Sequence, residues 1–123
     1  DVHPRRLARL NELILQTVST AALGLKDPGL GFVTFTSAET SPDVSTARIF
    51  YSVLGGEEDR TATAQALDRA KNHIRHEIGQ LENLRRVPQL LFVYDESVER
   101  ADRVTRLLNS INYEKDDSEN PAN

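Results

Sequence analysis

The chain has 123 residues, 38% of them hydrophobic, and a formal net charge of −4. This length and apolar content suffice for one compact domain, while the net charge means that any binding of nucleic acid needs a local basic patch. The absence of cysteine excludes disulfides and thiolate metal sites, and no apolar run approaches the roughly 18 residues of a membrane span.

The first predicted element is an amphipathic helix that follows Pro4, a residue suited to a first helical turn. Apolar residues recur at steps of three and four from Leu7 to Leu25. The segment from Lys26 to Gly29 then supplies a helix stop and a turn. The outer face of this helix begins with three arginines, Arg5, Arg6 and Arg9.

Two strand-like runs follow, both rich in β-branched and aromatic residues. The first covers Phe32 to Glu39, and the second alternates apolar and other residues from Ala47 to Val53. Between them, Thr40-Ser41-Pro42-Asp43 has the composition of a turn, so we expect an antiparallel hairpin.

A long helix with a basic outer face comes next. Its apolar residues keep helical spacing from Ala66 to Leu84, while its arginine, lysine and histidine residues lie elsewhere. We expect this helix to be interrupted, with Asn72 and Gly79 as weak points and Pro88 as its limit.

A third strand and a last helix complete the predicted fold. The strand covers Leu90 to Tyr94, Ser97 has the character of an N-cap, and apolar residues mark a helix from Val98 to Ile111. The order helix, strand, strand, interrupted helix, strand, helix predicts an α+β two-layer domain whose three-stranded sheet is covered by helices on one face.

The C-terminal end is acidic. From Asn112 onward, four acidic residues against Lys115 alone contribute −3 of the net charge of −4. Because this segment has almost nothing to bury, we expect one domain at residues 1–111 and an acidic disordered tail at residues 112–123.

Several short patterns stand in a characteristic order between residues 4 and 111. They are Arg5-Arg6-Leu7, Lys26-Asp27-Pro28-Gly29-Leu30-Gly31, Val33-Thr34-Phe35-Thr36, Ser41-Pro42-Asp43, the run from Ala47 to Gly55, Ile74-Arg75, the run from Leu84 to Phe92, and Asp95-Glu96-Ser97. Together with the order of elements they resemble the ribosome-binding factor A family, bacterial and organellar factors in small-ribosomal-subunit maturation. The resemblance implies a type II KH-like fold.

It also implies a kink inside the basic helix, between what would be the second and third helices of the fold. The family's usual Ala-x-Gly corresponds here to Ala70-Lys71-Asn72, so Asn72 replaces the glycine. Asparagine tolerates left-handed backbone better than most side chains, so a kink stays possible. Because the region has no GxxG sequence, clamping of a single RNA strand base by base is not expected.

We assign phosphate contact to the basic residues, because guanidinium and ammonium groups replace counterions along an RNA backbone. The alternative is a solvated helix face, and for Arg75 a structural role beside Ile74 is equally open. The candidate RNA-binding residues are Arg5, Arg6, Arg9, Lys71, Asn72, His73, Arg75, Arg85 and Arg86.

No pattern points to catalysis. His73 and His76 have a spacing that can hold a metal, but without a placed third ligand they are interpreted as surface groups. The chain has neither a Walker lysine motif nor a nucleophile elbow. We therefore expect no enzyme activity, no metal and no cofactor.

By resemblance, the predicted function is that of an assembly factor. It would bind the small ribosomal subunit and its precursor rRNA and assist late maturation of small-subunit rRNA, especially in the cold. We expect a monomer in the bacterial cytoplasm, with an organellar stroma or matrix left open, and no membrane or small-molecule partner. The alternative is a protein–protein adaptor of the same fold without direct RNA binding, whose interface would respond little to salt.

Overall fold

The computed structural model describes residues 2–82 and 84–119. The elements are α1 (Pro4–Leu25), the short 3₁₀ helix η1 (Pro28–Leu30), β1 (Val33–Thr40), β2 (Thr46–Val53), α2 (Glu57–Ile78), β3 (Gln89–Tyr94) and α3 (Ser97–Glu119). The strands form one sheet in the order β1-β2-β3, in which β1 is antiparallel and β3 parallel to β2. The predicted α+β class and the antiparallel hairpin are confirmed.

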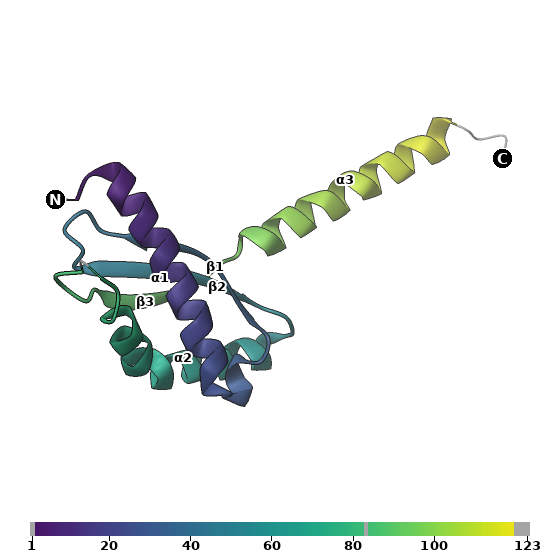
Figure 1. Cartoon of the computed structure of the whole chain (residues 1–123). Helices are drawn as coiled ribbons and strands as arrows, with labels where there is room; N and C mark the ends of the chain where they lie inside the picture. The colour runs from purple at the N-terminus through teal and green to yellow at the C-terminus, as the bar shows by residue number, and fades with distance from the viewer. Residues whose placement is uncertain (1, 83, 120–123) are drawn as a thin grey trace.

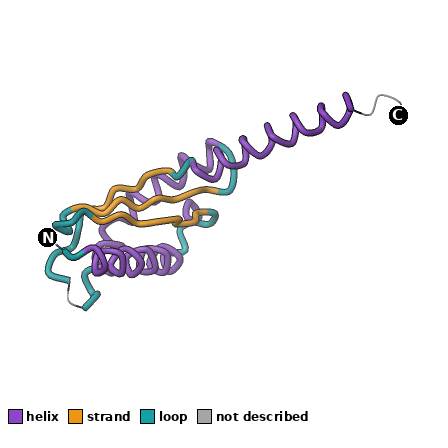
Figure 2. Tube along the Cα trace, turned by 90° about the horizontal axis from the view of Figure 1, so that it is seen from above, coloured by secondary structure: helices purple, strands orange, loops and turns teal. Residues whose placement is uncertain are grey.

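Helices α1 and α2 cover one face of this sheet (Figures 1 and 2). The sequence of β2 explains why the helices cover only one face, because successive side chains of a strand point to opposite faces of the sheet. Arg48 is exposed and Phe50 half-buried on the open face. The helix-covered face carries the buried residues Ala47, Ile49, Tyr51 and Val53.

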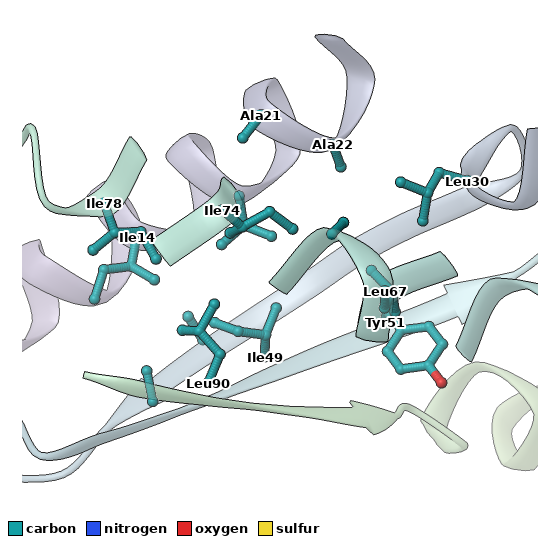
Figure 3. Close-up of a cluster of buried hydrophobic side chains, with 14 of the residues drawn as sticks. Ile14, Ala21, Ala22, Leu30, Ile49, Tyr51, Leu67, Ile74, Ile78 and Leu90 are labelled. Carbon is teal, nitrogen blue, oxygen red and sulfur yellow. The ribbon is translucent and has the colours of Figure 1, made fainter. Parts of the chain in front are cut away.

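The core lies between the two helices and this face. Ile49 of β2 and Leu90 of β3 lie on the side of the strands that faces Ile14 and Ile74, the contributions of α1 and α2 (Figure 3). The three isoleucines are fully buried and Leu90 is 2% exposed. Burying such a side chain stabilises the fold by about 1.5–3 kcal/mol relative to leaving it exposed.

The expected interruption of the basic helix does not occur at Asn72 in α2. It runs unbroken through Ala70, Lys71 and Asn72, and the backbone at Asn72 is not left-handed. Buried Ala70 and Ile74 keep the apolar side of the helix against the core on either side of this point. With no glycine there, the chain has no reason to leave the helical conformation, and asparagine is tolerated in it at modest cost.

The ends of α2 also differ from the prediction. The helix begins at Glu57, well before the predicted start at Ala66. At this N-terminus the Asp59 carboxylate accepts a hydrogen bond of 3.0 Å from the Gly56 N–H. It ends at Ile78, so the predicted weak point at Gly79 is its true limit. The described residues between Ile78 and Gln89 form turns and loop rather than a helical extension to Leu84.

Helix α3 projects away from the rest of the molecule (Figure 1). It does not stop at Ile111 but continues to Glu119, so most of the predicted disordered tail is helical in the structure. No glycine or proline interrupts this stretch, which allows the helix to continue. Residues 120–123 of the predicted tail lie outside the described residues.

Candidate nucleic-acid interface

Three segments meet at one end of the molecule, on the left in Figure 1: the start of α1, the β1–β2 turn and the α2–β3 loop. The Val2 N–H donates to the Pro42 carbonyl at 2.9 Å, which ties the start of α1 to the turn. The Gln89 N–H donates to the Ser45 carbonyl at 2.9 Å, which ties the loop to the same turn. Residues far apart in the sequence are thereby brought together.

Five of the predicted RNA-binding arginines lie on these segments. His3 caps the N-terminus of α1, and its Nδ1 accepts a hydrogen bond of 3.1 Å from the Arg5 N–H. All five side chains are exposed, and none forms an ion pair with any carboxylate whose side chain the structure describes. We call this group the basic end; its members are Arg5, Arg6, Arg9, Arg85 and Arg86.

The β1–β2 turn that joins these segments is held by Asp43. Its carboxylate accepts from the hydroxyls of Ser45 at 2.7 Å and Ser41 at 2.8 Å. These bonds, with the nearby charge of Arg86, lower the pKa of Asp43 to about 2. The network fixes a turn in which Val44, a β-branched residue, has a φ of 60°, a conformation that costs free energy on its own.

Arg75 has a different place from the other arginines. It is half-buried, and its Nε and Nη2 donate to the carbonyls of Pro88 and Val87 at 3.1 and 3.2 Å. The guanidinium therefore ties the last turn of α2 to the loop that carries Arg85 and Arg86. Of the two roles that the sequence left open for Arg75, the structure displays the structural one.

The remaining predicted residues are split between the two flanks of α2. Lys71, half-buried and 3.9 Å from the Asp68 carboxylate, borders a hollow of about 210 Å³ beside β3. His73 lines a shallow groove of about 620 Å³ between α1 and α2, and Asn72 is exposed between the two flanks. These three residues do not form one patch with one another.

The region read for metal binding offers no complete site. His73 and His76 are exposed, and the described part of the chain contains no group of three or more His, Cys, Asp or Glu residues that could hold a metal ion. Among the same residues, no helix is long and apolar enough to cross a bilayer.

Further arginines lie outside the predicted set. Arg48 is on the open face of the sheet, 3.5 Å from the Glu39 carboxylate. Arg100, Arg103 and Arg106 follow one another at steps of three on α3, and all three are exposed. That spacing is visible in the sequence and places three cations along one flank of a helix.

Comparison with known proteins places the chain in a family. The sequence model of the family "Ribosome-binding factor A" matches residues 6–108. Ribosome-binding factor A of Pelobacter propionicus is 37% identical over 118 residues, which cover 94% of this chain and 97% of the relative. The protein of the same name from Brevibacillus brevis is 39% identical over 110 residues, covering 89% and 91%.

Solved structures agree. A solution NMR structure of a Thermotoga maritima ribosome binding factor A candidate is similar with a TM-score of 0.68 and 34% identity, over 79% of this chain and 94% of that one. A Thermus thermophilus homology model fitted into an electron-microscopy map of a 30S complex shares the fold, with a TM-score of 0.57 and 22% identity over 70% and 91%. By its family match and its relatives, the chain belongs to the ribosome-binding factor A family.

Proposed function

We propose that this chain binds the small ribosomal subunit and assists late maturation of its rRNA, without catalysing a reaction, in the cytoplasm of a bacterium. The names of its relatives support ribosome binding. The description of the similar Thermus thermophilus model as part of a 30S complex supports the small subunit as the partner.

The observation that carries the proposal is the basic end. Arg5, Arg6 and Arg9 come from one segment, and Arg85 and Arg86 come from another about 80 residues away, yet hydrogen bonds tie both segments to the β1–β2 turn at one end of the molecule. Exposed guanidinium groups without a carboxylate partner are suited to bidentate contact with phosphate oxygens. A surface of this kind binds a polyanion even though the whole chain is acidic.

The other predicted residues have supporting places in this proposal. Arg75 positions the loop of Arg85 and Arg86 through its two carbonyl contacts. Lys71, Asn72 and His73 lie on the half of α2 that leads to this loop, and we assign them secondary contacts. The long Lys71–Asp68 separation, 3.9 Å, leaves the ammonium group available to a phosphate.

The mechanism requires binding free energy alone. A protein that binds one conformation of precursor rRNA more tightly than the others shifts the folding equilibrium toward that conformation. Because phosphate contacts release counterions, the affinity falls steeply as salt rises.

The test is co-sedimentation with purified small and large ribosomal subunits. The parent chain is compared with Arg85→Ala/Arg86→Ala and with the charge-matched control Arg48→Ala/Arg103→Ala, whose exposed arginines lie on the open face of the sheet and on α3 and are not members of the basic end. We expect selective binding to the small subunit and an affinity loss of about tenfold or more in the first variant, since hydrogen bonds to charged groups contribute about 1.5–3 kcal/mol each. Equal losses in both variants, or no selectivity, would contradict the proposal.

An adaptor function is the second candidate, favoured by apolar side chains on α3. Val104, Leu107, Leu108 and Ile111 are all more than half exposed and recur at helical spacing. If α3 made the principal contact, binding would survive high salt and would fall on Leu107→Ser rather than on loss of the arginines.

A further inference from the structure

Among its described side chains, helix α3 contacts the rest of the molecule through its first turn. Among the described side chains, each one from Arg100 to Ile111 is exposed, whereas Glu99 is half-buried. Figure 2 shows the helix leaving the sheet and both packed helices behind. The direction of α3 must therefore be set by the few residues that surround its first turn.

The first anchor is Asp95, the residue between β3 and α3. Its N–H donates to the Tyr51 carbonyl at 2.7 Å, which continues the pairing with β2. Its carboxylate accepts from the Thr36 hydroxyl of β1 at 2.6 Å and from the Ser97 N–H at 2.9 Å. One side chain thus joins the sheet to the first residue of α3.

The second anchor is Glu99, further along the first turn. Its carboxylate accepts from the Tyr94 hydroxyl at 2.8 Å and pairs with the guanidinium of Arg60, which comes from the first turn of α2. The Arg60 guanidinium also lies 4.4 Å from the centre of the Tyr94 ring. That ring meets Tyr51 edge to face, with centres 5.7 Å apart. The guanidinium of Arg60 is attracted to the Tyr94 ring, and that ring packs on Tyr51. The position of the guanidinium, and with it that of the Glu99 carboxylate, is therefore fixed.

From these contacts we infer that Glu99, through its bonds to Arg60 and Tyr94, is a positioning residue that holds α3 rigidly at one angle to the body of the molecule. By the body we mean the sheet with α1 and α2. Asp95 alone would fix the point where the helix begins and leave its direction free. A second attachment within the first turn fixes the axis, and the stiffness of an uninterrupted helix carries that direction outward. The basic end and α3 are then parts of one rigid body.

The experiment measures a distance between the body and α3. Because the chain has no cysteine, Gln65→Cys on α2 and Asn109→Cys on α3, both exposed, accept spin labels at those two positions alone. Pulsed electron resonance then gives the distance distribution in the full chain and in the chain carrying Glu99→Ala. The matched control is Asp102→Ala, which removes a carboxylate whose partner, Arg106, lies on α3 itself.

We expect one narrow distance in the parent and in Asp102→Ala, and loss of that narrow peak in Glu99→Ala. Arg60→Ala should broaden the distribution equally without altering the sequence of α3. A second label pair, Ala101→Cys with Asn109→Cys, should keep its distance throughout, which separates pivoting of the helix from its unravelling. A broad distribution in the parent, or an unchanged narrow peak in both Glu99→Ala and Arg60→Ala, would overturn the inference.

Discussion

The body of the molecule and α3 use apolar side chains in opposite ways. In the body, Ile14, Ile49 and Ile74 are fully buried between two helices and a sheet. On α3, Leu107 and Ile111 are 62% and 52% exposed. Most helical stability in proteins comes from tertiary packing of an apolar face, so the body is stabilised by its own core and α3 adds little to that core.

The largest expected effect comes from truncating the same side chain, isoleucine, in both regions. Ile74→Ala should lower the free energy of unfolding by about 2–5 kcal/mol, because the buried side chain leaves a cavity. Ile111→Ala should change it by less than about 0.5 kcal/mol, as is usual at exposed positions. Urea unfolding of both variants measures the difference, and similar losses would show that α3 belongs to the core.

A smaller effect is expected where η1 packs against α2. A Cβ at Gly29 would lie 2.7 Å from the Ala66 Cβ and 3.0 Å from the Ala62 carbonyl oxygen. Gly29→Ala should therefore cost about 1–3 kcal/mol through overpacking. Gly24→Ala is the control, since nothing lies within 4 Å and alanine favours the helix by up to about 1 kcal/mol. A stabilised Gly29→Ala variant would contradict the tight packing of η1.

Acid should lower the free energy of unfolding, because it protonates Asp43 in the β1–β2 turn. Hydrogen bonds from Ser45 and Ser41 lower the pKa of Asp43 from 3.8 to about 2, so the folded chain holds this proton less tightly than the unfolded chain. The resulting stabilisation is complete above pH 3.8 and is lost as the pH falls through about 2.

Asp43→Asn should flatten that part of the pH dependence, and Ser45→Ala should do so in part. Urea unfolding at a series of acidic pH values measures both effects. If the free energy of unfolding of Asp43→Asn depended on acidic pH as steeply as that of the parent, the hydrogen bonds of the Asp43 carboxylate in the turn would be contradicted.

The smallest effect is expected at the far end of α3. Removing residues 112–123 takes away a segment that follows an exposed stretch of helix, so unfolding should stay cooperative and shift by less than about 0.5 kcal/mol. Calorimetry of the shortened chain checks this, and a loss of cooperative unfolding would contradict the independence of the body.

The fold was predictable where side-chain patterns are regular. The alternation from Ala47 to Val53 marks a strand that the structure extends by one residue, to Thr46–Val53. The first half of α2 was missed because its buried Thr63 is held by a hydrogen bond of 2.8 Å to the Gly29 carbonyl, not by an apolar period. A kink at Asn72, which the sequence left open, does not appear as a break in α2, because tolerance of left-handed backbone does not require it.

The candidate site was predictable by residue type but not by grouping. Arginine-rich stretches identified Arg5, Arg6, Arg85 and Arg86, yet only the pairing of the turn with both segments brings them together. Arg75 looks the same as its neighbours in sequence. Its separate role depends on the direction of the Val87 and Pro88 carbonyls, which is a property of the folded loop.

Phosphate contact by the basic end is tested by measuring how the affinity for small ribosomal subunits depends on salt concentration. The parent is compared with Arg5→Ala/Arg6→Ala, with Arg85→Ala/Arg86→Ala and with the control Arg48→Ala/Arg103→Ala. Each lost phosphate contact should reduce the slope of log affinity against log salt by about 0.7–0.9. Reduced slopes in the first two variants and an unchanged slope in the control are predicted; an unchanged slope in all three variants would contradict the claim.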